Sequence, residues 1–205
     1  MALVTTAKYF LPRMLGNFCR RYPDIDIELE VANRARIVER LRANEDDLYI
    51  MSFPPEELDV VARPFLDNPL VVIAPADYPL PAGPLTLADL VAHPFLLRES
   101  GSGTRRAIDR HLLKSGHALN VKLSLGSNEA IRDLVATGMG LAILSRHVLG
   151  DNPAQGGIRI LEVEGFPLRQ PWSVVHLRQK ILSLPARAFM DELLPALDGA
   201  PPQGG

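Results

Sequence analysis

The sequence predicts an α/β protein of two Rossmann-like lobes, with mixed, mostly parallel sheets around a cleft between the lobes. Strand and helix patterns alternate along most of the 205 residues, as in chains that build parallel sheets. A Pro-rich segment at 74–84 interrupts this alternation, and the same pattern then starts again. The length exceeds the ~150 residues of an average domain without reaching two, so it suits one large domain or two small lobes.

The first part of the chain alternates between short strands and amphipathic helices. Apolar or alternating runs predict strands at 3–5, 25–31, 48–51, 58–65 and 69–74. Apolar residues one helical turn apart predict a helix that ends before Tyr22 and Pro23. A second, shorter helix is expected to bury Ile37, Val38 and Leu41.

The second part repeats this order. Strands are expected at 94–97, 121–125, 138–144, 157–163 and 171–178. Amphipathic helices are expected at 104–116, 128–137 and 186–197.

Two crossings between the lobes follow from this pattern. We expect the first in the Pro-rich segment and the second near 174–178. The first lobe then comprises residues 1–73 and 178–198, the second lobe residues 74–177, and residues 199–205 form a disordered tail. Two lobes joined in this way leave a cleft suited to a small molecule.

The sequence begins almost at once with its first strand. This abrupt start favours a truncation that removed an upstream domain, and a short natural N-terminus is the alternative.

Composition argues against several classes of protein. The formal net charge is −2, whereas a domain that grips the DNA backbone carries a basic excess. The single cysteine, Cys19, excludes a disulfide framework. No apolar run is long enough to span a membrane and no signal peptide opens the chain, so we expect a cytoplasmic protein without a membrane partner.

A search for catalytic, metal and cofactor motifs is negative. The sequence has no Gly-x-Ser-x-Gly elbow, complete dinucleotide fingerprint or Walker lysine. His111 and His117 are six residues apart, which does not suit a helical zinc pair. Cys19 and His111 lie on apolar helical faces, where packing is the simpler interpretation. We therefore expect no catalytic residue, metal or cofactor.

The segment from Arg98 to Arg105 differs from the rest of the chain, because small and hydroxyl residues join a buried strand to a helix. Its candidate ligand-binding residues are Glu99, Ser100, Gly101, Ser102, Gly103 and Thr104. The first N–H groups of a helix lack intrahelical partners and favour an anion. Ser102 or Thr104 could equally serve as an ordinary helix cap, and the local pattern leaves both interpretations open.

Two other helix starts are similar. Thr5 and Thr6 precede the first helix, with Lys8 in its first turn, and Ser127 and Asn128 precede the helix that begins near Glu129. Starts of this kind at the carboxyl ends of strands converge on one crevice in an open α/β fold. Lys8 as a surface lysine and Ser127 as a plain cap are the alternatives.

Four segments together resemble the effector-binding domain of LysR-type transcriptional regulators. They are Tyr22-Pro-Asp-Ile-Asp-Ile-Glu-Leu, Asp47-Leu-Tyr-Ile, Arg98-Glu-Ser-Gly-Ser-Gly-Thr-Arg and Gly138-Met-Gly-Leu-Ala-Ile-Leu. The resemblance covers residues 2–198. Asn33-Arg34, Phe53-Pro-Pro and Thr5-Thr-Ala-Lys-Tyr-Phe further resemble the CbbR-type branch, which regulates carbon-fixation and bicarbonate-uptake operons.

The resemblance implies a fold like type 2 periplasmic binding proteins, an anionic metabolite between the lobes and self-association to a dimer or tetramer. It implies that DNA is bound only through an N-terminal winged helix-turn-helix, which this sequence lacks. In this branch the effectors are often phosphorylated Calvin-cycle metabolites. The implied pocket positions are Thr5, Thr6, Asn33, Arg34, Ser52, 100–104 and 127–129. Relatives often have an arginine at the position of Ser52.

Two other functions remain as alternatives. One is a solute-binding protein of the same fold that serves a transporter. The other is a prephenate dehydratase-like lyase, although Thr104 and Arg105 are followed by Arg106 where that family has phenylalanine.

Overall fold

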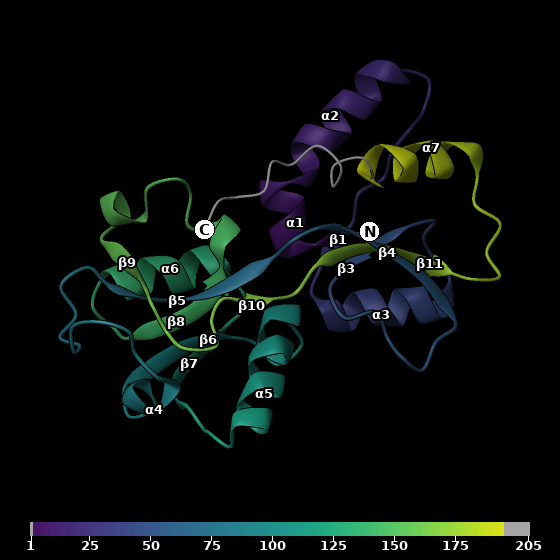
Figure 1. The fold of residues 1–205 in the computed structure, drawn as a ribbon. Coiled ribbons are helices and arrows are strands. Elements are labelled where there is room, and N and C mark those ends of the chain that lie inside the picture. The colour runs from purple at the N-terminus through teal and green to yellow at the C-terminus, as the bar shows by residue number, and fades with distance from the viewer. Residues whose placement is uncertain (1, 195–205) are drawn as a thin grey trace. The chain divides into compact units, whose positions relative to one another are not determined.

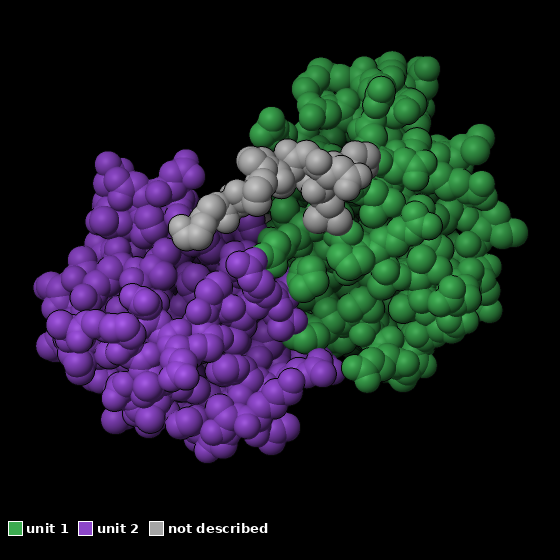
Figure 2. Space-filling view, viewed as in Figure 1, with its two compact units in different colours: residues 1–67, 171–205 green, residues 68–170 purple. Residues whose placement is uncertain are grey.

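The structure, a computed structural model, describes residues 2–194 (Figure 1). The chain divides into two compact units, which Figure 2 distinguishes by colour. Unit 1 comprises residues 1–67 and 171–205, and unit 2 comprises residues 68–170. Each unit has its own mixed sheet, as expected for this α/β fold class.

Among the described residues, unit 1 contains a five-stranded sheet in the order β2-β1-β3-β11-β4. Its strands are β1 (Ala2–Leu3), β2 (Val31–Ala32), β3 (Tyr49–Met51), β4 (Val60–Leu66) and β11 (Trp172–Leu177). Its helices are α1 (Val4–Tyr9), α2 (Leu11–Arg21), α3 (Arg34–Ala43) and α7 (Leu184–Leu193). Strands β1, β2 and β3 are parallel, whereas β11 runs antiparallel to β3 and β4.

Unit 2 has a six-stranded sheet in its described residues, in the order β10-β5-β8-β6-β7, with β9 paired to β5. Its strands are β5 (Pro69–Pro75), β6 (Pro94–Arg98), β7 (Asn120–Leu125), β8 (Leu141–Ser145), β9 (Ile158–Leu161) and β10 (Leu168–Arg169). Its helices are α4 (Leu87–Leu90), α5 (Gly103–Ser115) and α6 (Asn128–Ala136), with short 3-10 turns at Arg146–Val148 and Pro153–Gly156. β6 is parallel to β7 and β8, and β5 is antiparallel to β8, β9 and β10.

The Gly138-Met-Gly140 turn between α6 and β8 requires its second glycine. Gly140 has φ +155°, and a Cβ at this position would lie 2.3 Å from the carbonyl oxygen of Pro94. The close approach allows β8 to lie beside the start of β6, where Leu141 pairs with Phe95.

The chain passes between the units earlier than the sequence predicted. The transitions fall at 67/68 and 170/171 instead of 73/74 and 177/178. β5 therefore belongs to unit 2, because this apolar strand pairs with β8, β9 and β10, and the Pro-rich segment after it is a loop of the same unit. β11 belongs to unit 1 because it pairs with β3 and β4.

Two strand predictions in unit 1 were wrong in extent. Of residues 25–31 only Val31 is in a strand, because β1 is two residues long and offers β2 only two partners. Ile27 and Leu29 are consequently exposed. The strand predicted at 3–5 ends at Leu3, and α1 begins at Val4.

Three other expectations have different outcomes. Cys19, predicted to pack inside, is exposed, because the buried face of α2 is formed by Leu11 and Phe18. The predicted tail at 199–205 lies outside the described residues. No helix in residues 2–194 has the length and apolar character needed to cross a membrane.

Candidate functional site

The polar positions of unit 1 lie at one edge of its sheet. β1 is parallel to β2 and β3, with Leu3 opposite Ala32 and Ala2 opposite Ile50. The carboxyl ends of these strands therefore meet at the same edge, and the residues that follow each strand share it. The predicted positions at this edge are Thr5, Thr6, Asn33, Arg34 and Ser52.

Arg34 connects two of these segments. Its Nε and one terminal nitrogen donate hydrogen bonds of 3.0 and 2.7 Å to the carbonyl oxygen of Phe53. Phe53 has φ +52°, a left-handed conformation that costs energy for a residue with a side chain. Arg34 thus holds a strained turn directly after Ser52, which is itself buried.

The start of α3 is capped within unit 1. The Asn33 side chain accepts a hydrogen bond of 3.2 Å from the backbone N–H of Arg36. The cap satisfies one of the N–H groups that a helix start leaves without a partner.

The first helix start differs from its prediction. Because α1 begins at Val4, Thr5 and Thr6 lie inside the helix and do not precede it. Thr6 is buried, and Lys8 lies in the last turn of this short helix, where its side chain is exposed. The expectation of Lys8 in the first turn beside an open N-terminus was therefore wrong.

The polar positions of unit 2 also share a sheet edge. β6 and β7 are parallel, and Arg98 at the end of β6 pairs with Leu125 at the end of β7. The loop 99–102 leads from β6 into α5, and residues 126–127 lead from β7 into α6. The two helix starts that the sequence singled out in this unit therefore lie next to each other.

Arg98, absent from the predicted site residues, joins these two starts. Its side chain is only 4% exposed. Nη1 donates to Oδ1 of Asn128 at 2.8 Å, and Nε and Nη2 donate to the two carboxylate oxygens of Glu99 at 2.8 and 3.0 Å. A planar guanidinium suits such a fork. The one sequence signal was a charge at the end of a strand otherwise made of apolar residues.

The Arg98 backbone adds to the same network. Its carbonyl oxygen accepts hydrogen bonds from the Ser124 hydroxyl and from a guanidinium nitrogen of Arg105, both at 3.3 Å. Residues from β6, β7 and the first turns of α5 and α6 are therefore tied to one buried position.

Both helix starts in unit 2 have serine caps. The Ser102 hydroxyl, 3% exposed, accepts from the N–H of Arg105 at 3.0 Å, and the Ser127 hydroxyl accepts from the N–H of Ala130 at 3.2 Å. The capping interpretation left open by the sequence is thus correct for both serines. Each cap uses one of the N–H groups in the first turn, which leaves the others oriented as an anion site requires.

The charge at this edge is largely compensated. Glu99, 28% exposed, would repel an anion, but both of its carboxylate oxygens are bound by Arg98. Glu129 accepts a hydrogen bond of 3.0 Å from the Ser127 hydroxyl. Of the remaining predicted positions, Gly103 and Thr104 begin α5, and Ser100 is exposed in the loop before it.

Within residues 2–194, no group of three or more His, Cys, Asp or Glu side chains is arranged to hold a metal ion. The pKa of His111 on α5 is lowered, first by burial and then by the nearby His117 and Lys114. Its ring contacts Phe166 edge to face at 5.2 Å, as a packed residue does.

The model of one protein family, the LysR substrate binding domain, matches residues 1–198. The HTH-type transcriptional activator CmpR of Synechocystis is 44% identical over 194 residues, which are 94% of this chain and 64% of CmpR. A RuBisCO operon transcriptional regulator of Acidithiobacillus ferrooxidans is 44% identical over 200 residues, 96% of this chain and 64% of the relative. The chain therefore spans about two thirds of the length of these curated relatives.

Among solved structures, the regulatory domain of Synechocystis CcmR in complex with 2-PG matches with a TM-score of 0.91 and 44% identity, covering 98% of this chain and 97% of that one. The effector binding domain of QuiR in complex with shikimate matches with a TM-score of 0.83 at 20% identity, covering 94% of this chain and 92% of that one. The second match supports the fold alone. These relatives are regulators, which disfavours the transporter and lyase alternatives.

Proposed function

The chain belongs to the LysR substrate-binding-domain family, and on that premise we propose that it is the part of a transcriptional regulator that senses a small phosphorylated metabolite. The sequence resemblance to this family and to its carbon-fixation branch is confirmed, because relatives at 36–44% identity include CmpR, CbbR and RuBisCO operon regulators.

The Arg98 network in unit 2 carries the proposal. Two capped helix starts lie side by side, and one buried guanidinium binds Asn128 at the start of α6 and neutralises the carboxylate of Glu99 in the loop before α5. This arrangement presents oriented N–H groups and hydroxyls to an anion before any ligand arrives. A site organised in advance loses little free energy on ordering its own groups.

Phosphate is the anionic group that we assign to this edge. The CcmR regulatory domain, which shares 44% identity with this chain, was solved in complex with 2-PG, that is 2-phosphoglycolate. Each charge-assisted hydrogen bond contributes about 1.5–3 kcal/mol net. Three such bonds give roughly 5–9 kcal/mol before ordering costs, and after those costs we expect dissociation constants between about micromolar and millimolar.

The predicted contribution of unit 1 stays a prediction. A ligand held between the units, as the sequence resemblance implies, would take its contacts in unit 1 from Arg34, Asn33 and the residues near Ser52. Arg34 can contribute only as far as its two bonds to the Phe53 carbonyl permit.

Regulation needs a ligand that binds one arrangement of the protein more tightly than another, because equal affinity shifts no population. A coupling of about 1–3 kcal/mol is typical of such proteins. We propose that the arrangement concerned is a dimer or tetramer in the cytoplasm, and that DNA is bound through another domain of the regulator.

Isothermal titration calorimetry tests the proposal with 2-phosphoglycolate and, as a matched control, glycolate, which lacks the phosphate. We expect saturable binding of 2-phosphoglycolate, at least tenfold tighter than glycolate, and loss of this preference in Ser102→Ala. Equal affinity for both compounds would contradict the assignment of phosphate. Conversion of prephenate by the chain would instead revive the lyase alternative.

A further inference from the structure

The chain passes between the units beside Asp67 and beside Pro171, the two residues that we call the links. Unit 1 holds its ends of both links in one strand pair, because Leu66 at the end of β4 pairs with Trp172 at the start of β11. The register of these strands shifts between Trp172 and Ser173, which indicates a β-bulge. A bulge bends its strand, so the ladder of unit 1 is irregular directly beside the links.

Unit 2 also holds its ends of the two links together. Asn68 comes directly before β5 and Gln170 directly after β10, and these two strands are antiparallel neighbours. The N–H of Gln170 donates a hydrogen bond of 3.2 Å to the carbonyl oxygen of Asn68. A single link residue separates each of them from the strand pair of unit 1. Proline has a fixed φ, so the link at Pro171 has less backbone freedom than the link at Asp67.

The side chain of Asn68 attaches this point to a third strand. Asn68 and Ser145 are 5% and 2% exposed, and the Ser145 hydroxyl donates to Oδ1 of Asn68 at 2.6 Å. Ser145 is the last residue of β8, which pairs with β5 on the side opposite to β10. Asn68 is therefore hydrogen-bonded on both sides of its own strand.

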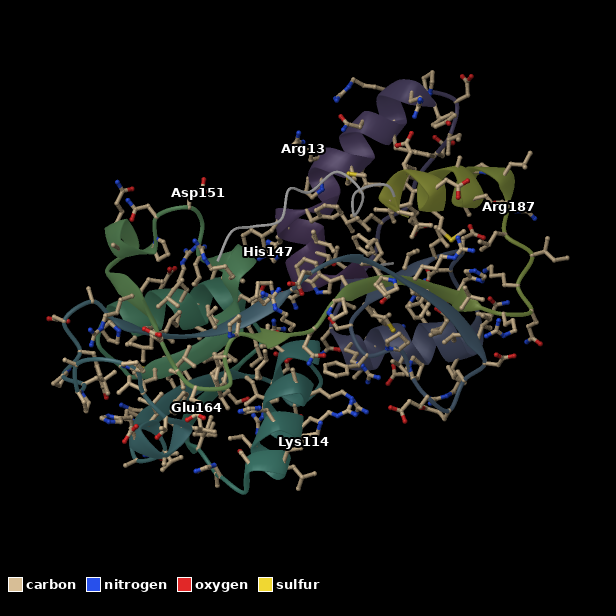
Figure 3. All side chains as sticks on the ribbon, viewed as in Figure 1. Arg13, Lys114, His147, Asp151, Glu164 and Arg187 are labelled. Atoms are coloured by element: carbon tan, nitrogen blue, oxygen red, sulfur yellow. The ribbon has the colours of Figure 1, made fainter. Side chains whose placement is uncertain are left out.

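Ser145 also organises the turn that follows β8. Its hydroxyl oxygen accepts a hydrogen bond of 3.3 Å from the N–H of His147, which Figure 3 labels in the 3-10 turn Arg146–Val148. The same hydroxyl thus donates to Asn68 and accepts from His147. A buried hydroxyl with both functions in use favours one side-chain orientation.

The surroundings of this polar pair are apolar. Leu70, which pairs with Ser145 across the sheet, and its neighbour Leu144 are fully buried. A buried polar group that loses its partner is costly in such surroundings, because no water replaces the lost hydrogen bond. The alignment of Asn68 with Ser145 is therefore favoured over arrangements that separate them.

We propose that the Asn68–Ser145 hydrogen bond is a conformational lock for the links. It fixes the point where the chain enters unit 2, and through the carbonyl of Asn68 it also fixes the point where the chain leaves. Bending between the units is then confined to Asp67, Pro171 and the adjoining bulge, which limits the orientations that the units sample. Without the lock, the start of β5 adds freedom at both links at once.

The lock has a consequence for regulation when a ligand contacts both units, and this consequence rests on the proposed function. Such a ligand loses less free energy on ordering the protein when the units already sample few orientations. The lock itself is a property of the chain without ligand, so it is measured without an effector and is independent of the effector's identity.

Distances between spin labels, measured by pulsed electron paramagnetic resonance, test the lock. One pair of labels spans the units, Glu39→Cys on α3 with Lys114→Cys on α5. The other pair lies within unit 2, Lys114→Cys with Asp151→Cys, at two positions that Figure 3 labels. All three side chains are exposed, and Cys19→Ser removes the exposed native thiol. Dilution with unlabelled chain removes distances between copies from the signal.

Ser145→Ala should broaden the distance distribution of the pair that spans the units. Since this variant loses the net contribution of one hydrogen bond, we expect the population outside the wild-type range to rise about 2- to 10-fold. The pair within unit 2 should keep its distribution. Thr137→Val is the matched control, because it removes another hydroxyl hydrogen bond of unit 2, 2.8 Å to the carbonyl oxygen of Leu134, and should change neither distribution.

Asn68→Ala removes the same hydrogen bond from its other partner and should broaden the same distribution. The double variant should broaden it no further than the larger single change, because both changes remove one interaction. If Asn68→Ala does not fold, Ser145→Ala decides alone. An unchanged distribution between the units in Ser145→Ala, equal broadening within unit 2, or additive effects in the double variant would overturn the proposal.

Discussion

An arginine holds the polar segments at the sheet edge of each unit, but the two arginines bind different partners. In unit 2 a buried guanidinium, Arg98, ties Glu99 in the loop before α5 to Asn128 at the start of α6. In unit 1 the corresponding cation, Arg34, is half-buried and holds a backbone carbonyl in a strained turn. Arg98 acts between two neighbouring helix starts, whereas Arg34 acts on the loop after β3.

The difference indicates which part of the site is fixed in advance. The three guanidinium nitrogens of Arg98 have their partners, Glu99 and Asn128, inside unit 2, so we expect this edge to keep its form without a ligand. The Arg34 guanidinium must share or give up bonds to Phe53 in order to grip a phosphate. We therefore expect the Arg98 edge of unit 2 to bind phosphate without rearranging its own hydrogen bonds.

Removal of the buried arginine should have the largest effect. Arg98→Met removes the buried guanidinium that binds Glu99 and the buried Asn128, which should cost about 3–5 kcal/mol of unfolding free energy. Urea denaturation measures this loss. Arg132→Met, which removes an ion pair with the exposed Asp133 and a long hydrogen bond of 3.4 Å to the Val148 carbonyl oxygen, should cost only about 1 kcal/mol. Equal losses of unfolding free energy in the two variants would show that the Arg98 network stabilises the fold no more than Arg132 does.

Arg34→Met tests the role of the arginine at the sheet edge of unit 1. Loss of two charged hydrogen bonds to the Phe53 carbonyl should cost about 1.5–3 kcal/mol. Arg36→Met on the same helix, which breaks only an exposed pair with Glu39, is the matched control. If Arg34 only supports the turn, 2-phosphoglycolate affinity stays within threefold in calorimetry. A loss of tenfold or more would place Arg34 among the ligand contacts.

Ser102→Ala separates capping from ligand binding. Loss of the cap costs about 1 kcal/mol, and the same change at Ser127 should cost a similar amount. Ser115→Ala, at the exposed end of α5, is the control and should be nearly neutral. Thermal unfolding gives the stability change. A normal affinity for 2-phosphoglycolate in Ser102→Ala would limit this serine to its capping role.

The smallest effect concerns His111. Burial lowers its pKa in the folded state, so the fold favours the neutral ring. Its contribution to stability is complete above the unfolded pKa of about 6.5 and is lost as the pH falls through the folded pKa. His111→Gln should therefore flatten the decline of unfolding free energy below pH 6.5. If the variant shows the same decline, the loss of stability at low pH comes from titratable groups other than His111.

Much of the fold could be predicted because local signals agreed with the tertiary structure. Ile37, Val38 and Leu41 are buried as their spacing predicted, and the serines before α5 and α6 cap them. Segment 25–31 was misjudged because alternation describes one strand alone, whereas a ladder needs a partner, and β1 offers two residues.

Arg98 could not be found by the same reasoning. A charged residue at the end of a strand is ordinarily exposed, and its burial depends on Asn128, thirty residues further along the chain. The position of Lys8 was predicted wrongly for a local reason, since α1 begins at Val4, three residues earlier than the threonine pair suggested. Caps can thus be predicted from sequence more readily than the buried groups that tie them together.

An amide NMR titration of the chain with 2-phosphoglycolate tests the central claim most directly. The account predicts saturable shifts that are largest at the first turns of α5 and α6, at Gly103, Thr104, Asn128 and Glu129. It also predicts that all of these shifts become smaller in the Arg98→Met variant, measured without urea while the variant is folded. Saturable shifts that leave both helix starts unchanged would contradict it.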